Sequence, residues 1–304
     1  MGKVVAVCIS AKKGEKKKSV GKARLIENFG FEGDAHAGAW HRQVSLLAVE
    51  SIEKMKEKGL SVGPGDFAEN ITTEGIDLAC LPVGTRLKIS DVLLEVTQIG
   101  KECHSRCAIF RQAGDCIMPR EGIFARVLRG GVVSEGDEIK VMPLIRVGIL
   151  TASDRGARGE REDKSGKVIE EMIETINGRV EEYAVVPDDL EAIKSSLIAM
   201  CEKGLDLVLT TGGTGLSPRD NTPEATLAVV EKVVPGIAEA MRYKSLEKTP
   251  HAMLSRGLAG IRGKTLIINL PGSPKAVREN LEVVLPAIPH AVELLNGGVR
   301  DCGK

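Results

Sequence analysis

The chain has 304 residues, of which 42% are hydrophobic and 3% aromatic, so its cores must be built mainly from Val, Ile, Leu and Ala. This length exceeds that of a usual single domain, and we expect two domains. Lys and Arg together number 42, as do Asp and Glu, so the formal net charge is zero. That balance excludes a bulk electrostatic attraction to nucleic acid or to an anionic membrane, and any anion must be bound locally.

The sequence shows no targeting signal. The apolar run Val4–Ile9 is too short for a signal peptide or a membrane span, and no uninterrupted apolar stretch reaches membrane length. The seven cysteines are odd in number and unevenly spread, which favours free thiols over a disulfide framework. We therefore expect a reducing, cytoplasmic setting, with neither a membrane nor a nucleic acid as partner.

Residues 1–143 alternate short apolar strands with turn signals, a rhythm that predicts a small β-rich barrel. The predicted strands are Val4–Ile9, Val44–Leu47, Leu87–Ile89, Val92–Val96 and Glu138–Val141. One helix is predicted over Val49–Lys58, ending at Gly59. The basic run from Lys12 to Lys18 is predicted to be a solvated hairpin loop.

Three thiols and an imidazole lie within fourteen positions, 103 through 116. Cys103 and Cys107 are separated by three residues, which supplies only one of the two ligand pairs of a structural zinc site. A buried, inert thiol is the plainest interpretation of any single cysteine. Arg106 beside Cys107 instead favours a reactive thiolate, because positive charge stabilises it. Lys101 and His104 do the same for Cys103.

Three segments of this half carry a family signature. They are Gly30-Phe31-Glu32-Gly33-Asp34-Ala35-His36-Ala37-Gly38, Arg42-Gln43-Val44-Ser45-Leu46-Leu47 and Ser105-Arg106-Cys107-Ala108-Ile109, with Gly136-Asp137 as a closing turn. They resemble the MOSC domain, which is found at the carboxyl end of molybdenum-cofactor sulfurases. The resemblance covers roughly residues 1–142 and implies a β-barrel that binds the molybdenum cofactor.

The same resemblance implies that Cys107 is a molybdenum ligand or a sulfur carrier, with Cys103 as the second candidate. A soft thiolate suits molybdenum or persulfide chemistry. No pyridoxal-phosphate desulfurase domain precedes the barrel in this chain, so the sulfur donor is expected to be another protein. Sulfur transfer, metal insertion and simple retention of the product all remain open for this half, and His36 and His41 either orient a ligand or make ordinary hydrogen bonds.

After Met142-Pro143 the rhythm changes to strand, loop and helix, so we place the second domain at residues 144–304. Its predicted strands are Val147–Thr151, Val180–Val186, Leu205–Thr211 and Leu266–Leu270. Ser165 and Thr222 are predicted to cap two of the intervening helices. Alternating β and α units with apolar strands predict a mostly parallel sheet covered by helices on both faces, an α/β fold.

In such a sheet ligands bind beyond the carboxyl ends of the strands, and four strand ends here carry polar residues. They are Ser153 and Asp154 after the first strand, Asp188 after the second, Thr211, Gly212, Gly213, Thr214, Gly215, Arg219 and Asp220 after the third, and Asn269, Pro271, Gly272, Ser273 and Lys275 after the last. Each could be an ordinary turn or cap, but their convergence on one edge favours a ligand site.

The glycines at 212, 213 and 215 let backbone N–H groups approach phosphate oxygens closely. The loop is neither a Walker A sequence nor a dinucleotide fingerprint, because Gly-Lys-Ser/Thr and Gly-x-Gly-x-x-Gly are both missing. Asp220 and Asp188 are candidate magnesium ligands, since this cation prefers carboxylate and phosphate oxygens together. Lys275 offers a point charge for a second phosphate.

These motifs, together with Ser153-Asp154-Arg155 and Leu270-Pro271-Gly272-Ser273-Pro274-Lys275, resemble the molybdopterin adenylyltransferase family of the MogA/MoaB type. The likeness runs from about Arg146 to Gly298. It implies a homotrimer that converts molybdopterin and magnesium-ATP to adenylyl-molybdopterin and pyrophosphate. Asp220 and Asp188 fall at the family's catalytic carboxylates. Thr211–Gly215 falls where the nucleotide phosphates sit, and Ser273 with Lys275 where the pterin phosphate is held.

The sequence therefore predicts a bifunctional protein of molybdenum or tungsten cofactor biosynthesis. Because both domains belong to one chain, an intermediate made by one domain would have a raised effective concentration at the site of the other. Expected partners are a molybdenum-insertion protein, a sulfur donor or a molybdoenzyme. The alternative is a non-catalytic carrier or scaffold that binds the pterin without chemistry. A third possibility makes the first half a thiol-dependent reductase or detoxifying module.

Overall fold

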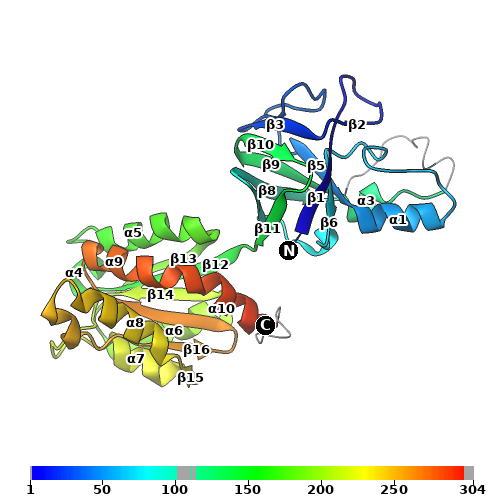
Figure 1. Ribbon diagram of the computed structural model, residues 1–304. Coiled ribbons are helices and arrows are strands. Elements are labelled where there is room, and N and C mark those ends of the chain that lie inside the picture. Colours follow the sequence, from blue (N-terminus) through cyan, green and yellow to red (C-terminus); the bar gives the residue numbers. More distant parts are fainter. Residues whose placement is uncertain (1, 101–109, 111–113, 298–304) are drawn as a thin grey trace. The chain divides into compact units, whose positions relative to one another are not determined.

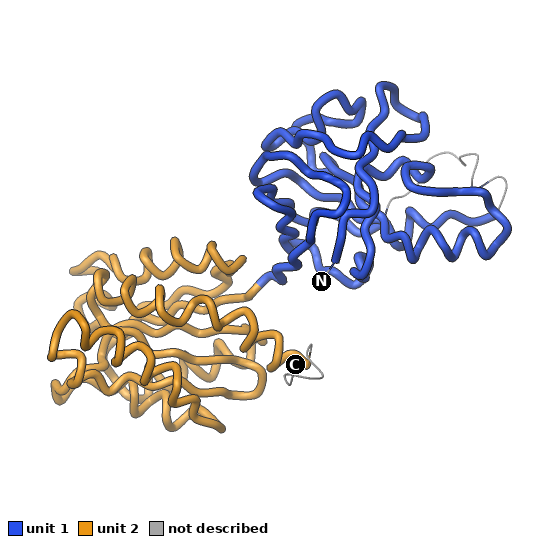
Figure 2. Tube along the Cα trace, in the orientation of Figure 1, with its two compact units in different colours: residues 1–144 blue, residues 145–304 orange. Residues whose placement is uncertain are grey.

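The computed structural model describes residues 2–100, 110 and 114–297 (Figure 1). The chain divides into two compact units, residues 1–144 and 145–304, coloured blue and orange in Figure 2. Each unit has its own apolar core, built from aliphatic side chains as the composition predicts. The two units are described separately below.

The N-terminal unit is a closed, mostly antiparallel β-barrel. Its strands run in the order β11-β7-β8-β9-β5-β6-β1, and pairing of β1 with β11 closes the ring. The only parallel pair in this ring is β5 with β6. The strands are β1 (Gly2–Ile9), β2 (Lys18–Ser19), β3 (Lys22–Ile26), β4 (Gly30–Phe31), β5 (Val44–Ala48), β6 (Ile71–Glu74), β7 (Arg86–Ile89), β8 (Val92–Ile99), β9 (Ile123–Arg129), β10 (Gly131–Ser134) and β11 (Glu138–Met142).

Alternate residues of the ring strands point into the barrel and are fully buried, as the period of a strand requires. Leu87 and Ile89 of β7 and Leu94 and Val96 of β8 show this pattern. A second apolar cluster lies where α1 (Val49–Glu57) and α3 (Met118–Glu121) cover β5 and β9. A single 3-10 turn, η1 (Leu78–Cys80), completes the described elements of this unit.

The predicted β-rich barrel is confirmed, and all five predicted strands and the helix are present with bounds shifted by a few residues. The sequence analysis missed β2, β3, β4, β6, β9 and β10 and the short helix α3. The prediction for the basic run was wrong at Lys17, because that side chain is only 1% exposed and its Nζ lies 2.6 Å from the Asp34 carboxylate. The remaining lysines of the run are exposed, as predicted.

The C-terminal unit has a central sheet with the strand order β13-β12-β14-β17-β16-β15. The first four strands pair in parallel, β16 is antiparallel to β17 and β15 is antiparallel to β16, so the predicted mostly parallel sheet is confirmed. The strands are β12 (Ile145–Ala152), β13 (Gly178–Val186), β14 (Leu207–Thr211), β15 (Lys232–Val233), β16 (Ala259–Arg262) and β17 (Thr265–Leu270).

Helices cover both faces of this sheet (Figure 1). One apolar core joins the sheet to α5, α8, α9 and α10, and a second core joins the opposite face to α6 and α7. On β14, Leu207 and Leu209 belong to the first core and Val208 to the second. The helices are α4 (Asp154–Ala157), α5 (Lys164–Ile173), α6 (Leu190–Glu202), α7 (Thr222–Val229), α8 (Pro235–Leu246), α9 (Pro274–Val284) and α10 (Ile288–Leu295), with the 3-10 turns η2 (Glu174–Ile176), η3 (Pro250–Leu254) and η4 (Leu285–Ala287).

Two predicted helix caps are corrected by the structure. Helix α5 is capped by Asp163, whose side chain accepts hydrogen bonds from the N–H groups of Ser165 and Gly166. Ser165 instead donates its hydroxyl to the Gly272 carbonyl, 2.8 Å away. Thr222 is the first residue of α7, and its hydroxyl bonds the Gly212 carbonyl at 2.9 Å. The Ser165 bond joins the start of α5 to the turn after β17, and the Thr222 bond ties the start of α7 to the glycine turn of its own connection from β14.

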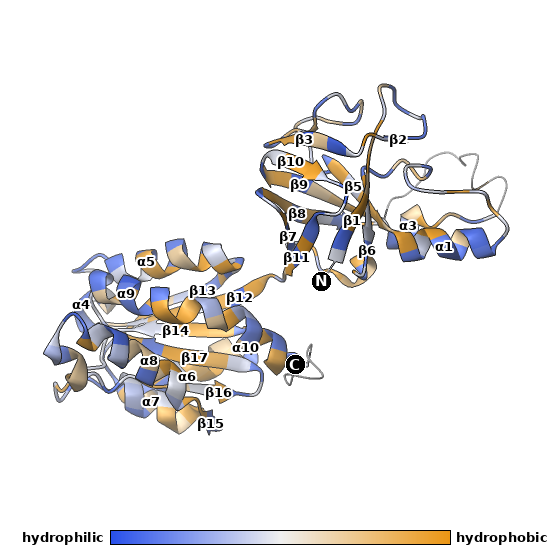
Figure 3. Cartoon of the chain, viewed as in Figure 1, coloured by the Kyte–Doolittle hydropathy of each residue, from blue (hydrophilic) through white to orange (hydrophobic). Residues whose placement is uncertain are grey.

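The hydropathy of the molecule follows this layering, with apolar positions on the strands and polar positions on the outward helix surfaces (Figure 3). No helix among the described residues combines the length and the apolar character needed to cross a lipid bilayer.

Candidate active site

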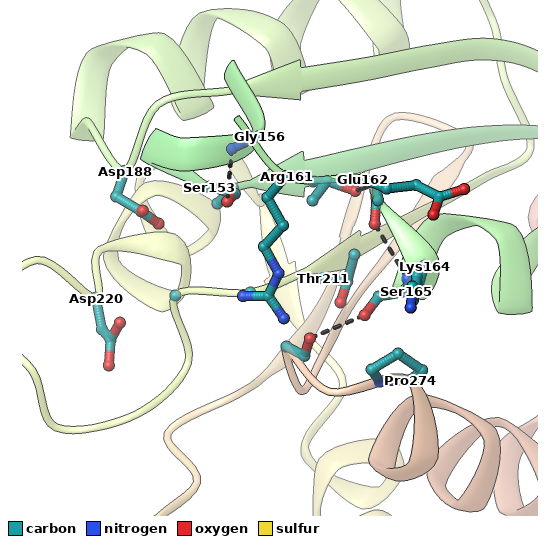
Figure 4. Close-up of a pocket in the computed structure, with 16 residues that line it drawn as sticks. Ser153, Gly156, Arg161, Glu162, Lys164, Ser165, Asp188, Thr211, Asp220 and Pro274 are labelled. Carbon is teal, nitrogen blue, oxygen red and sulfur yellow. Dashed lines mark hydrogen bonds between the residues drawn. The ribbon is translucent and has the colours of Figure 1, made fainter. Parts of the chain in front are cut away.

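The carboxyl ends of β12, β14 and β17 lie side by side, because Thr151 pairs with Thr211 and Thr211 with Leu270. A cavity of about 360 Å³ opens at this edge, and we call it the edge cavity (Figure 4). Its lining residues come from the turns after all four parallel strands and from the start of α5. They are Thr151, Ala152, Ser153, Gly156, Arg161, Glu162, Asp163, Lys164, Ser165, Asp188, Thr211, Gly212, Gly213, Asp220, Gly272 and Pro274.

Seven of the predicted site residues line the edge cavity, and they come from all four predicted strand ends. They are Ser153, Asp188, Thr211, Gly212, Gly213, Asp220 and Gly272. The convergence expected from a parallel sheet is therefore present in the structure. What each of these residues binds stays a prediction.

The glycine turn after β14 leaves no room for side chains. Gly212 has φ +90°, and a Cβ there would lie 2.3 Å from the Ala152 carbonyl oxygen. Gly213 has φ +61°, and its Cβ would lie 2.5 Å from the Thr222 hydroxyl. Left-handed φ values combined with these close approaches require glycine at both positions. The turn therefore presents bare backbone to the cavity, which suits an approaching phosphate.

Two half-buried carboxylates flank this turn. A Cβ on Gly213 would lie 3.6 Å from Asp188 Oδ1, and one on Gly215 would lie 2.8 Å from Asp220 Oδ2. Asp188 Oδ2 accepts a hydrogen bond from Asp154 N at 2.9 Å, and Asp220 Oδ2 accepts one from Ser217 N at 3.1 Å. The other carboxylate oxygen of each residue accepts none from the described part of the chain, so both can bind a ligand.

Asp154 and Arg219 were predicted to bind cofactor, but neither lines the edge cavity. Asp154 exchanges hydrogen bonds with Asp188, since each backbone N–H donates to the carboxylate of the other residue, at 2.9 and 3.1 Å. Arg219 Nη2 lies 2.6 Å from Asp154 Oδ2. These contacts fix Asp188 and tie the turn after β12 to the loop that carries Asp220. The structure shows only these contacts, and a cofactor-binding role for the two residues stays a prediction.

Ser273 and Lys275 also lie outside the lining of the edge cavity. Ser273 caps α9, and its hydroxyl accepts a hydrogen bond from Ala276 N at 3.3 Å. Both side chains are exposed at the start of this helix. A phosphate role for them stays a prediction, and the structure itself shows only the cap.

The remaining predicted residues, Thr214, Gly215, Asn269 and Pro271, line a second, separate hollow of about 290 Å³. We call it the side hollow. The Asn269 side chain is 1% exposed and donates to the hydroxyls of Thr210 and Thr226 at 3.0 and 2.9 Å. Asn269 therefore holds β14 and α7 together at the base of the site.

The sequence analysis did not select a cationic pair that lines the edge cavity. Arg161 extends its guanidinium across the cavity toward the glycine turn, and Lys164 lies at the start of α5 (Figure 4). Neither side chain has an ion-pair partner among residues that the structure describes. The signal was the charged run that follows Ser153, from Arg155 to Lys164, but a charged run by itself does not show which charge turns inward.

Asp163 anchors the wall that carries this pair. Its Oδ2 accepts hydrogen bonds from the Thr151 hydroxyl and, at 2.7 Å, from the Tyr183 hydroxyl. Burial raises the pKa of Asp163, but the hydrogen bonds from Gly166, Thr151 and Tyr183 outweigh it, so the pKa lies below its ordinary value. The pKa of Tyr183 is raised, first by burial and then by its bond to this carboxylate. Asp163 is therefore a charged acceptor and Tyr183 a neutral donor.

In the N-terminal unit, Cys103, Cys107 and their neighbours lie outside the described residues, so the predicted thiol chemistry is not placed. Within residues 2–100, 110 and 114–297, no group of three His, Cys, Asp or Glu side chains could hold a metal. A small hollow of about 80 Å³ lies beside β5 and β9, lined by His36, Trp40, Arg42, Ser45, Phe67, Ala68, Asn70, Met118 and Phe124. The Arg42 guanidinium stacks over the Phe124 ring, 5.4 Å from its centroid.

Fold and site together define a parallel α/β domain with an acidic, glycine-lined ligand cavity at the carboxyl edge of its sheet. Residues 148–290 match the model of the probable molybdopterin binding domain, and residues 33–140 match the MOSC domain. The chain is 52% identical over 166 residues to a molybdopterin adenylyltransferase of Helicobacter pylori, covering 54% of this chain and 94% of that protein.

Two further similarities concern the same region. Gephyrin of Dictyostelium discoideum is 49% identical over 160 residues, which is 49% of this chain and 22% of gephyrin. The molybdopterin biosynthesis enzyme MoaB of Thermus thermophilus has 55% identity, a TM-score of 0.49, and coverage of 51% of this chain and 98% of that structure. The chain belongs to the molybdopterin adenylyltransferase family through its C-terminal unit, and the predicted fusion with a MOSC domain is confirmed.

Proposed function

We propose that the C-terminal unit transfers the adenylyl group of ATP to molybdopterin. The observation that carries this proposal is the glycine turn with Asp188 and Asp220 on either side, each with one carboxylate oxygen available to a ligand. Family membership supports the choice of substrates, because the relative from Helicobacter pylori is named a molybdopterin adenylyltransferase. Both substrates are anions, so the site must hold together two groups that repel each other.

In the proposed reaction, a terminal phosphate oxygen of molybdopterin attacks the α-phosphorus of ATP. The bond between the α-phosphorus and its bridging oxygen to the β-phosphorus breaks, and pyrophosphate leaves with that electron pair. The bare backbone at Gly212 and Gly213 holds phosphate oxygens in line. Arg161 and Lys164 neutralise charge on the departing pyrophosphate, which a cation without an internal partner can do.

The residues present fit a magnesium ion. Magnesium is typically held by one or two carboxylates together with substrate phosphates, and Asp188 and Asp220 each leave one oxygen for it. When bound, the ion would offset phosphate charge that repels the attacking oxygen. The ion pair of Asp154 with Arg219 would keep Asp188 turned toward the cavity.

The N-terminal unit is proposed to bind the molybdenum or tungsten cofactor and to handle its metal or sulfur, with Cys107 as the thiolate. Its support is the MOSC match over residues 33–140 and the sequence around Cys107. A sulfur donor, a metal-insertion protein or a molybdoenzyme would be its partner. A homotrimer through the C-terminal unit belongs to the same proposal, and light scattering on the purified chain tests it.

The decisive experiment measures pyrophosphate release from ATP in the presence of molybdopterin and magnesium. The wild-type chain is expected to release pyrophosphate only when all three are present, and Asp220→Asn is expected to abolish release without loss of the folded circular dichroism spectrum. Asp189→Asn is the matched control, because Asp189 caps α6 and lies outside the edge cavity, and Asn also caps helices.

Near-normal release by Asp220→Asn would refute the catalytic role of that carboxylate. Binding of molybdopterin by the wild type without any pyrophosphate release would favour the non-catalytic carrier instead.

A further inference from the structure

The loop over residues 215–220, which we call the Asp220 loop, carries a proposed magnesium ligand on an exposed stretch of chain. Its central residues are exposed, so no buried apolar side chain anchors it. Ser217 N donates to Asp220 Oδ2 at 3.1 Å, and Asp220 N donates to the Ser217 carbonyl at 2.9 Å. The ion pair of Arg219 with Asp154 is the contact of the tip with another turn, and an exposed ion pair contributes little. The ends of the loop must therefore be held by other contacts.

Arg256, in the segment between η3 and β16, bonds both ends of the Asp220 loop. Its Nε donates to the Gly215 carbonyl at 2.7 Å, and its Nη2 donates to the Asp220 carbonyl at 2.5 Å. Its backbone N–H adds a bond to the Thr214 carbonyl at 3.0 Å. A guanidinium is planar and holds its donors at fixed angles. One side chain thus sets the separation of the two carbonyls.

The charge of Arg256 is neutralised within the chain. Its Nη1 pairs with the Glu224 carboxylate in the first turn of α7. Arg256 lines neither the edge cavity nor the side hollow, and its side chain is 34% exposed. All three nitrogens of the guanidinium group donate to acceptors of the same chain, so this cation holds protein groups in place and is not offered to a phosphate.

The backbone that follows Arg256 is itself fixed. Arg242 Nη1 of α8 donates to the Gly257 carbonyl at 2.8 Å. Asn269 N donates to the Leu258 carbonyl at 2.9 Å, and Leu258 N donates back to Asn269 Oδ1 at 3.3 Å. Asn269 lies on β17 and is 1% exposed. Arg256 therefore extends to the Asp220 loop from a base that is bonded to a central strand.

The contact at Gly215 bears on the chemistry because the Asp220 carboxylate lies over that residue. A Cβ on Gly215 would be 2.8 Å from Asp220 Oδ2. Gly212 and Gly213, whose backbone lines the edge cavity, lead into Gly215 through one further residue. The spacing between this backbone and Asp220 is thus the spacing that Arg256 holds. A misplacement of about 1 Å in a site can lower a rate about a hundredfold.

We propose that Arg256 is a positioning residue, which fixes Asp220 relative to the glycine turn and contacts neither substrate. The chemistry assigned to Asp220 rests on the proposed function, whereas the hold on the loop is a property of the chain itself. Loss of the guanidinium should therefore lower kcat, leave the KM values for ATP and molybdopterin near those of the wild type, and free the Asp220 loop.

The first test replaces the guanidinium by an ammonium. Arg256→Lys keeps the positive charge beside Glu224 but cannot span both carbonyls, and it is expected to lower kcat of pyrophosphate release more than about tenfold. Both KM values should change less than about twofold, because the substrate contacts stay. Arg262→Lys is the matched control, since Arg262 Nη1 donates to the Val229 carbonyl at 3.1 Å and this side chain lines neither space. Its kcat should match that of the wild type.

The second test measures the loop without turnover. Arg219 is 65% exposed on the Asp220 loop, so trypsin can cut after it once the loop opens. Arg256→Lys should be cut there at least about fivefold faster than the wild type, with the urea midpoint unchanged. Arg262→Lys should be cut at the wild-type rate, and mass spectrometry identifies the cut.

A milder variant decides the question if Arg256→Lys does not fold. Glu224→Ala removes the ion pair that orients Nη1 and leaves both carbonyl bonds, so kcat should fall about threefold, the effect of one exposed ion pair. Cleavage after Arg219 should rise in the same variant.

Normal kcat in folded Arg256→Lys would overturn the proposal. A raised KM with normal kcat would overturn it as well and make Arg256 a substrate-binding residue. A lower urea midpoint with wild-type kcat and wild-type cleavage after Arg219 would leave Arg256 a structural role alone. If the wild type releases no pyrophosphate, the proposed catalysis fails, while faster cleavage of Arg256→Lys would still show that Arg256 holds the loop.

Discussion

Charged residues in the two units are arranged in opposite ways. In the barrel, Asp34 Oδ2 accepts hydrogen bonds from Lys17 at 2.6 Å and from Ser10 and Asn70 at 3.1 Å, and Oδ1 accepts one from His36 N at 2.8 Å. In the edge cavity, Asp188 and Asp220 each keep one oxygen uncommitted. The barrel carboxylate is saturated by its own chain, whereas the cavity carboxylates are not.

This comparison indicates which charged side chains are candidates for binding a ligand. Burial alone does not identify them, because Asp34 and Lys17 are the more buried pair, with side chains 2% and 1% exposed. Burial raises the pKa of Asp34, but bonds from His36 and Lys17 outweigh it and hold the carboxylate ionised. Burial lowers the pKa of Lys17, and its bond to Asp34 opposes that shift. A charged group whose hydrogen-bond partners all come from its own chain serves the fold. A charged group with an oxygen that accepts no hydrogen bond from the described residues can bind a ligand.

The largest effect is expected when the saturated pair is broken. Lys17→Met leaves a buried carboxylate without its ion-pair partner and should lower the free energy of unfolding of the barrel by about 3–5 kcal/mol. Lys16→Met is the control, because Lys16 is 61% exposed in its ion pair with Asp66, and it should cost less than about 1 kcal/mol. Urea unfolding of both variants measures the contrast, and equal costs would remove the distinction between the two lysines.

Replacement of Arg161, one of the two cationic side chains that line the edge cavity, should weaken ligand binding and leave the fold unchanged. Arg161→Gln is expected to weaken pyrophosphate about tenfold, because a charge-assisted hydrogen bond is lost, with no change in the urea midpoint. Arg158→Gln is the control, since Arg158 pairs with Glu160 at 2.8 Å and lies outside the cavity. A drop in stability with unchanged pyrophosphate affinity would make Arg161 a structural residue and contradict the comparison.

Asp163 stands between the two cases, since it is saturated and also lines the edge cavity. Asp163→Asn retains a helix cap and should cost about 1 kcal/mol at neutral pH, because the bonds from Thr151 and Tyr183 lose their charge assistance. The folded-state pKa of Asp163 is lowered, so this stabilisation is present above the ordinary carboxylate pKa of about 3.9 and is lost as the pH falls through the folded value.

The free energy of unfolding of wild type and Asp163→Asn, measured across the acidic range, checks the sign. The difference between the two should shrink as the pH falls. A difference that grows on acidification would show that the pKa of Asp163 is raised in the folded protein.

The smallest effect is expected at Asp154 and Arg219, which lie outside the edge cavity. Asp154→Asn should lower the rate of pyrophosphate release about threefold. The substitution removes the ion pair with Arg219 that holds Asp154 in place against Asp188. Arg219→Gln should act alike, and the double variant should be no worse than either single one, since both break the same contact. Additive losses would show that Asp154 and Arg219 act separately on the substrates.

Comparison of prediction and structure shows which signals the sequence carries. Alternating β and α units predicted the parallel sheet, and the parallel register placed Ser153, Asp188, Asp220 and Gly272 around one cavity. The predictions missed Arg161 because a charged loop has no period from which the direction of one side chain follows. Asp154, Ser273 and Lys275 were selected by position after a strand, which does not show whether a side chain turns into the cavity or onto its own backbone.

The sequence by itself determined the two units, their fold classes, the family and the strand ends that form the site. Hydrophobic period and glycine position, which are local and can be read along the chain, predicted the units, fold classes and strand ends, while the family followed from the resemblance of its motifs. Only the tertiary structure showed that Asp34 neutralises Lys17, whereas Arg161 has no ion-pair partner among the described residues. It alone also showed that the edge cavity and the side hollow lie on either side of the glycine turn. Those outcomes depend on contacts between residues far apart in the sequence, such as Arg256 with Gly215, and no local pattern encodes them.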